Sequence, residues 1–320
     1  MSCVRKRGGN VCPEISRKVS MIVPPGSVVV TDWHKTPEGK EYFATLLRQN
    51  KRRLFGLTER PVLPPQVGAD IASYKVFVSG KSGVGKTALV AKLAGLEVPL
   101  VHHETTGIQT TTVYWPAKLR ESGKAIFFKF SFWDCGEAVL KKFDHVLPAC
   151  TEKVDGLLLL FSFTDRASFD DLPNQISRVA DGANNAIRMV VGTKFDQFAH
   201  TDVTDRDVTA FRHTWGLPVL RAKSVNAPRL ADGQTLDGRA GLSDVAHLLN
   251  GLAEHLWRQD QLVAGLIAPS MTPGPLEEQN PWTRRCFTAQ QEDGGPQARD
   301  EELGERRETL WLWRGPHPPK

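Results

Sequence analysis

Apolar positions fall into two kinds of run that alternate between about residues 73 and 260. Continuous or alternating apolar runs, which predict strands, cover residues 74–78, 108–115, 125–133, 156–163, 187–192 and 218–220. Apolar positions at helical spacing predict helices over residues 86–93, 168–179, 205–215 and 242–257, with Ser168 as the candidate cap of the second. This alternation predicts an α/β fold with a mostly parallel, doubly wound, six-stranded sheet, helices on both faces, and a ligand at the carboxyl ends of the strands.

The segments that flank this pattern differ from it and from each other. Residues 1–35 lack sustained periodicity, so a flexible segment is expected. From Thr36 an apolar stripe at helical spacing (Tyr42, Phe43, Leu46, Leu47) predicts a short amphipathic helix, followed by a linker to residue 72. We expect this helix to pack on the main domain, with docking onto a partner as the alternative. Residues 261–320 are rich in proline, glycine and acidic residues, which predicts disorder.

A glycine-rich loop follows the first strand of the main domain. The sequence G-K-S-G-V-G-K-T from Gly80 to Thr87 lies between a predicted strand and a predicted helix. This spacing is typical of a P-loop, in which backbone N–H groups surround a polyphosphate while a lysine adds charge and a hydroxyl binds Mg²⁺. The loop therefore predicts a nucleotide site, although it does not separate kinases and ATPases from GTPases.

A second motif narrows the choice of nucleotide. Gly192-Thr193-Lys194-Phe195-Asp196 follows the strand predicted over residues 187–192. The Asp196 carboxylate can accept paired hydrogen bonds from the N1–H and amino group of guanine, which adenine does not offer in that arrangement. Lys194 would lie along the base. This motif favours a guanine nucleotide over ATP.

Composition and charge change the picture little. The chain has a net charge of +5, and residues 1–72 hold 12 Lys and Arg against 6 Asp and Glu. We interpret this basic excess as a solvated surface and expect no nucleic acid partner, because no aromatic residues are interleaved with it. The five cysteines are scattered, and no run approaches the length of a membrane span, so a cytosolic protein is expected. The end Pro318-Pro319-Lys320 has no cysteine motif, so no direct lipid anchor is expected.

Together these motifs resemble the Ras superfamily of small GTPases, and the loop S-G-K-S-G-V-G-K-T and the run F-T-D-R-A-S-F-D-D-L resemble Rab proteins. The resemblance covers residues 73–259 and implies a Ras-like G domain that binds GTP or GDP with Mg²⁺. It implies phosphate contacts from the P-loop, namely from Ser82, Gly83, Val84, Gly85, Lys86 and Thr87.

The resemblance also assigns residues outside the P-loop. Thr105, 18 positions after Thr87, matches the threonine that senses the γ-phosphate, which makes residues 96–110 the first switch. His102 would cover the phosphates, although a loop histidine is more often solvent-exposed. Ala222 and Lys223 match the last guanine loop, with Arg221 in place of its usual serine and the backbone N–H of Ala222 retained. The metal would be held by Thr87, Thr105 and Asp134.

The second switch departs from the family pattern. Relatives read W-D-x-x-G-Q-E, whereas this chain reads Trp133-Asp134-Cys135-Gly136-Glu137-Ala138, one residue shorter. Neither register supplies the glutamine that orients the attacking water, and Glu137 is only a weak candidate for its role. We therefore expect nucleotide binding with impaired hydrolysis.

The resemblance to a Rem- and Rab-like member of the superfamily, which also takes in residues from Val28 onward, implies a switch protein that binds effectors in ciliogenesis and planar cell polarity. It implies Fuzzy- and Inturned-type partner proteins and a place at the basal body of the cilium and on the cytoskeleton. The alternatives are an ordinary hydrolysing GTPase in vesicle trafficking and protein transport, and a P-loop kinase or ATPase.

Overall fold

The computed structural model describes residues 23–48, 70–101, 103–143, 145–180, 182–183, 185–226 and 238–267. The expectations for residues 1–22, for most of the linker, for His102 and for the tail beyond residue 267 lie outside these residues. All described residues belong to one compact unit. Among the described helices, none is long and apolar enough to cross a membrane.

A six-stranded sheet forms the centre of this unit. The strands are β1 (Ile71–Gly80), β2 (Ile108–Lys118), β3 (Ala125–Cys135), β4 (Gly156–Ser162), β5 (Ile187–Thr193) and β6 (Val219–Arg221). Their order is β2-β3-β1-β4-β5-β6, and all neighbours are parallel except β2 and β3. The predicted α/β fold with a mostly parallel, doubly wound sheet is confirmed.

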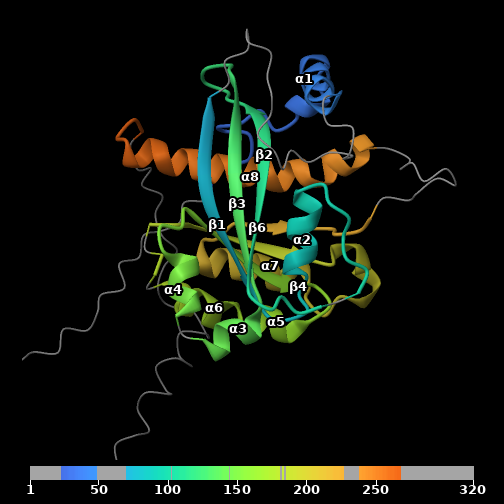
Figure 1. Cartoon of the computed structure of the whole chain (residues 1–320), viewed down its shortest axis with the longest axis vertical. Helices are drawn as coiled ribbons and strands as arrows, with labels where there is room; N and C mark the ends of the chain where they lie inside the picture. Colours follow the sequence, from blue (N-terminus) through green and yellow to red (C-terminus); the bar gives the residue numbers. More distant parts are fainter. Residues whose placement is uncertain are drawn as a thin grey trace, which may run out of the picture. The chain divides into compact units, whose positions relative to one another are not determined.

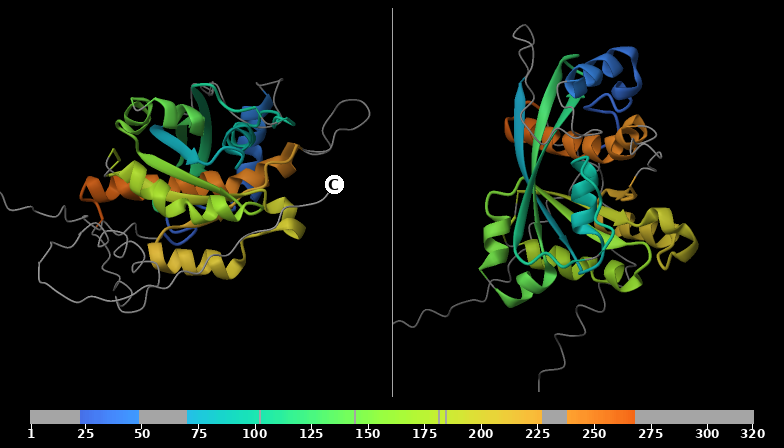
Figure 2. Two further views of the ribbon diagram at one scale, coloured as in Figure 1. Left: turned by 90° about the horizontal axis from the view of Figure 1, so that it is seen from below. Right: turned by 45° about the vertical axis from the view of Figure 1, so that its right-hand side comes forward.

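Helices cover both faces of this sheet, as predicted (Figures 1 and 2). One face packs against α2 (Lys86–Leu93), α8 (Gly238–Val263), α1 (Pro37–Arg48) and the short 3₁₀ helix η1 (Trp33–Lys35). The other packs against α3 (Glu137–Lys142), α4 (Val146–Thr151), α5 (Arg166–Asp170), α6 (Leu172–Ala180) and α7 (Asp205–Trp215). Each of α3 and α4 has six residues, too few for a helical period to be visible in the sequence.

The helix predicted over residues 168–179 is in fact two helices, α5 and α6. Pro173 has no N–H to bond a carbonyl one turn back, so it fits in the first turn of a helix but not in its interior, and α6 begins anew at Leu172. The cap of α5 is Asp165, whose side chain accepts the N–H of Ser168. Ser168 is not the cap; it is buried, and its hydroxyl accepts the N–H of Ser162 at 2.9 Å.

Residues 23–36, hereafter the strap, form hydrogen bonds with the main domain that the lack of periodicity in residues 1–35 did not indicate. The strap pairs with the end of β2 and the turn that follows it, through Val30 N–H to Lys118 O and Arg120 N–H to Val28 O, both 2.9 Å. Glu254 Oε1 on α8 accepts the N–H groups of Val28 (3.3 Å) and Val29 (3.2 Å). These partners are distant in sequence, so local periodicity could not indicate them.

The helix predicted from Thr36 is α1, and it packs on the main domain as expected. Its Phe43 ring lies 5.5 Å from the ring of Trp115 on β2, and Lys118 forms an ion pair with Glu38 at 2.7 Å. Figures 1 and 2 show α1 beside the end of the β2–β3 hairpin that is far from α3 and α5. Of its apolar stripe, Phe43 is buried and Tyr42 is partly buried.

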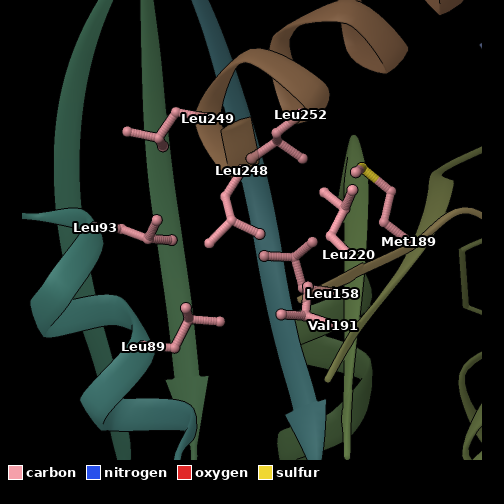
Figure 3. Close-up of a pocket in the computed structure, with 9 residues that line it drawn as sticks. All are labelled: Leu89, Leu93, Leu158, Met189, Val191, Leu220, Leu248, Leu249 and Leu252. Carbon is pink, nitrogen blue, oxygen red and sulfur yellow. The ribbon is translucent and has the colours of Figure 1, made fainter. Parts of the chain in front are cut away.

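A small cavity of about 10 Å³ lies between α2, α8 and the sheet. Figure 3 shows that nine apolar side chains, Leu89 and Leu248 among them, surround it. Because no polar group lines this space, it is a packing defect of the core and not a nucleotide site.

Candidate functional site

The P-loop connects β1 to α2, as the motif predicts. Gly83 (φ 79°) and Gly85 (φ 96°) adopt left-handed conformations that other residues rarely adopt, which explains two of the glycines in the motif. Gly85 is the N-cap of α2 and offers no side chain to bond the first-turn N–H groups. These N–H groups and the positive end of the helix dipole are therefore available to an anion.

Lys86 folds back across this loop. Its ammonium donates hydrogen bonds to Gly80 O (2.8 Å) and Lys81 O (2.9 Å), and the residue is only 7% exposed. Burial lowers the pKa of Lys86, while the carboxylates of Asp134, Glu137 and Glu104 act in the opposite direction. The site thus holds one buried cation that water solvates poorly and that phosphate oxygens could solvate instead.

Three oxygen-bearing side chains from separate segments meet at the start of α2. The Thr87 hydroxyl donates to Asp134 Oδ2 (2.5 Å), and it lies 3.1 Å from the Thr105 hydroxyl. Asp134 is 1% exposed, and its Oδ1 has no hydrogen-bond partner among the described residues. Burial raises the pKa of Asp134, although Thr87 and Lys86 act against it. A buried carboxylate oxygen without a partner is an anomaly that a cation would resolve.

This donor set fits Mg²⁺. The ion prefers oxygen ligands, keeps several waters, and commonly combines one or two protein oxygens with substrate phosphates. No group of three His, Cys, Asp or Glu side chains suited to a metal occurs in the part of the chain that the structure describes. A metal here would therefore depend on Thr87, Thr105 and Asp134, the three residues that the resemblance implies, and on the nucleotide itself.

Within the second switch, Gly136 lies against the first switch. A Cβ at Gly136 would lie 2.2 Å from Thr105 O, so only glycine permits this approach. Glu137, the first residue of α3, accepts the N–H of Ser82 in the P-loop at 2.7 Å. Ala138 N–H donates to Glu104 Oε1 at 3.1 Å. These bonds connect the P-loop with both switches. The bond that Glu104 accepts could not be predicted, because an acidic residue in an exposed loop has no distinctive sequence pattern.

The guanine motif is tied to the P-loop through Thr193. Its hydroxyl donates to Val84 O (2.5 Å) and to Phe161 O (3.0 Å). The next residue, Lys194, has a φ of 55°, which is uncommon for a side chain of this size and is typical of a functional site. Asp196 follows in the 3₁₀ helix η2 (Phe195–His200) and is partly buried.

The last guanine loop differs from expectation in one respect. The backbone N–H of Ala222 is not free for a base, because it donates to Gly192 O at 2.8 Å and extends the pairing of β5 with β6. The arginine that replaces the family's serine, Arg221, lies over the Phe195 ring at 4.7 Å and pairs with Asp205 at 2.5 Å. Lys223 is exposed directly after this strand.

The structure brings together Lys86, Thr87, Thr105 and Asp134, and the P-loop contacts the motif of Lys194 and Asp196 through Thr193. His102 is outside the described residues.

Glu137 lies against the P-loop, where a charged carboxylate accepts hydrogen bonds but cannot donate one. Burial raises the pKa of Glu137, but its bonds to Lys141 and Ser82 lower it more, so the pKa lies below its usual value.

A model of the Ras family matches residues 75–228. Ciliogenesis and planar polarity effector 2 of Homo sapiens is 70% identical over 253 residues, which cover 79% of this chain and 96% of the relative. The protein of that name from Mus musculus is 67% identical over 79% of this chain and 100% of the relative. Ras-related protein Rab-1D of Dictyostelium discoideum is 24% identical over 50% of this chain and 74% of the relative.

Proposed function

This chain belongs to the Ras family, and we propose that it is a Mg²⁺-dependent GTP-binding switch. The observation that carries this proposal is the meeting of Thr87, Thr105 and Asp134 at the N-terminus of α2, with an unpaired buried oxygen on Asp134. These residues come from the P-loop and from both switches. A ligand at that point therefore acts on all three segments.

Each segment has a separate task in this proposal. The N–H groups of Gly83 to Thr87 and the Lys86 ammonium bind the phosphates, and Mg²⁺ neutralises part of their charge. Asp134 and Thr105 hold the second and first switch at the metal, so the positions of both loops depend on the bound nucleotide. An effector that contacts these loops then binds one nucleotide state better than the other.

We expect hydrolysis to be slow. Glu137 occupies the place of the catalytic glutamine in one register, but its carboxylate is held by Ser82 N–H and Lys141. Single-turnover hydrolysis of GTP should therefore run below the intrinsic rate of about 10⁻⁴ per second known for such proteins. A rate at or above that value would favour the ordinary hydrolysing GTPase.

Guanine selectivity is tested by titration with GTP and ATP. We expect GTP to bind tightly and ATP to bind much more weakly. The variant Asp196→Asn should shift the preference from guanine toward xanthine nucleotides by at least about tenfold, because the amide matches the xanthine edge. Equal affinity for ATP and GTP would instead favour a kinase or ATPase.

The names of the relatives associate them with ciliogenesis and planar polarity, and we propose that this chain acts in the same processes. The proposed partners are Fuzzy- and Inturned-type proteins, and the proposed site of action is the basal body of the cilium. Co-precipitation with these partners should weaken for Thr87→Asn, which removes a metal-binding hydroxyl. Binding that is equal for this variant and the original chain would indicate a scaffold without a nucleotide switch.

A further inference from the structure

The side chain of Asn226 joins the last guanine loop to the first switch. Its Oδ1 accepts the N–H of Val98 at 2.8 Å, and its Nδ2 donates to Val98 O at 2.9 Å. One amide thus satisfies both backbone groups of a residue 128 positions away in the chain, and only this orientation of the amide allows both bonds. Val98 is buried, so its backbone groups have little access to water as an alternative partner.

Val98 lies near the start of the first switch, between a buried helix and an exposed loop. The helix α2 ends at Leu93, whereas Leu100 and Val101 are exposed. Figure 1 shows the chain leaving the end of α2 and running back beside this helix toward the start of β2. The bonds of Asn226 therefore hold the first switch before the point at which its side chains turn outward.

The other end of the same loop is attached to the guanine motif. Ala222 N–H donates to Gly192 O at 2.8 Å, and Ala222 O accepts the N–H of Phe195 at 3.3 Å. Phe195 lies between the two residues proposed to bind the base, Lys194 and Asp196. The loop therefore leads directly from the proposed base site to the first switch.

The middle of this loop is held by α2. Lys92, in the last turn of α2, donates to Val225 O at 2.8 Å and lies 3.8 Å from a carboxylate oxygen of Asp244 on α8. The first turn of the same helix faces the proposed phosphate site. Residues 222–226 thus keep a fixed place relative to both ends of the nucleotide site, and Asn226 attaches the first switch to them.

We propose that Asn226 is a positioning residue that keeps the start of the first switch closed against the base side of the site and thereby slows release of guanine nucleotide. A bound base fixes residues 222–226, and Asn226 transmits this constraint to the first switch through Val98. The bonds act before Thr105 in the chain, so the ordering of Thr105 by Mg²⁺ and the γ-phosphate is unaffected. This inference deepens the proposed function and rests on it, because it requires guanine nucleotide at the site.

The test measures the rate at which GDP labelled with N-methylanthraniloyl leaves the protein in excess unlabelled GDP and Mg²⁺. Asn226→Ala should raise this rate about tenfold, because it removes both hydrogen bonds to Val98. Asn226→Asp still accepts the Val98 N–H but cannot donate to Val98 O, and it should raise the rate at least about threefold. Asn174→Ala is the matched control and should leave the rate unchanged, because the exposed amide of Asn174 donates to the nearby Asp171.

Hydrogen exchange separates this role from a general loss of stability. In the original chain GDP should protect the amides of residues 96–101 and those of residues 86–90 in α2. Asn226→Ala should lose more than half of the protection at residues 96–101 and keep that at residues 86–90. The inference is overturned if either Asn226 variant releases GDP within about twofold of the original rate, or if Asn226→Ala loses protection equally in both segments or in neither. Failure of the original chain to bind GDP would instead refute the proposed function itself.

Discussion

At the scale of single residues, close backbone contact between the two switches depends on Gly136. A Cβ there would lie 2.2 Å from Thr105 O, a distance at which the backbone must move. Thr105 is also the residue whose hydroxyl approaches Thr87 at 3.1 Å. The absence of one side chain therefore allows the first switch to lie at the cluster of Thr87, Thr105 and Asp134.

We expect Gly136→Ala to weaken binding of the Mg²⁺ complex of a GTP analogue by about tenfold. The added methyl group overpacks this contact at a cost of about 1–3 kcal/mol, and the backbone shift that makes room for it displaces Thr105. Calorimetric titration with and without Mg²⁺ measures this effect. The control is Gly251→Ala in α8, where the new Cβ meets only the flexible ends of Leu220 and Met189 at 3.3 Å or more. Equal affinities for the two variants would show that the switches do not need this contact.

At the scale of elements, the strap is held by polar groups of α8 that are themselves buried. Glu254 accepts two backbone N–H groups of the strap, and Asn250 joins Trp115 Nε1 (2.7 Å) on β2 to Thr31 O (2.9 Å). Burial of such groups is costly unless every donor is satisfied. The strap is therefore attached at specific points and not by apolar contact alone.

Glu254→Ala should destabilise the protein by about 2–4 kcal/mol, because it leaves the N–H groups of Val28 and Val29 without an acceptor at about 1–3 kcal/mol each. Urea unfolding measures the loss, and limited proteolysis should cut the strap more readily. Asp32→Ala is the control: its carboxylate is 70% exposed and pairs with Lys35, so its removal should leave the free energy of unfolding almost unchanged. A similar loss for both variants would contradict the assigned role of Glu254.

The contact of the strap with His255 should make the stability of the protein depend on pH. His255 Nε2 accepts the N–H of Val23 at 3.5 Å, which requires a neutral ring with its proton on Nδ1 toward Gly251 O. Burial lowers the pKa of His255 below its ordinary value of about 6.5. The unfolded chain therefore binds more protons, and the contribution of His255 to stability, complete above about pH 6.5, is lost as the pH falls toward the folded-state pKa.

Between pH 7.5 and 5.5 the original chain should lose about 1 kcal/mol more unfolding free energy than His255→Gln, whose amide accepts the same N–H but does not titrate. Burial raises the pKa of Glu254, which acts in the opposite direction, but that group is present in both proteins and cancels in the comparison. The exposed His213→Gln on α7 should retain the pH slope of the original chain. The assignment fails if His255→Gln retains that slope as well.

These elements also show how far the sequence could be interpreted. The sheet, α2 and α7 were predictable because their apolar periods are local, and the motifs of Lys86 and Asp196 were visible at once. The division of α5 from α6 is not visible in the apolar period, which continues through Pro173 as if one helix ran from residue 168 to 179. The sequence could not predict the hydrogen bonds of the strap or the bond of the Ala222 N–H in the sheet, because both have partners that are distant in sequence.

At the scale of the whole molecule, the nucleotide should act as a stabilising ligand. The P-loop, both switches and the guanine motif come from separate parts of the chain, so the proposed ligand would bind the folded state and not the unfolded chain. At a concentration 100 times the dissociation constant, Mg²⁺ and GDP should add about 2.7 kcal/mol of stability. For a folded unit of this size that corresponds to a rise in Tm of roughly 5–11 °C.

Differential scanning fluorimetry with GDP, with GDP and EDTA, and with ATP measures this effect. We expect EDTA to remove more than half of the rise in Tm, because Asp134 and Thr87 then lack the Mg²⁺ that would bridge them to the phosphates. ATP should give a rise of less than about 1 °C. A shift that is insensitive to EDTA would count against the assignment of the metal to Thr87, Thr105 and Asp134.

The attachment of the strap to α8 also fixes an order of events during synthesis. Val29 and its acceptor Glu254 are 225 residues apart, so the strap leaves the ribosome long before its partner exists. At about 5–20 residues per second, that interval is roughly 11–45 seconds. During this time the Val29 N–H lacks its acceptor on α8, whereas Trp33 can already pack against Tyr42 and Phe43 of α1. The strap is thus translated early but is among the last segments to reach its final position.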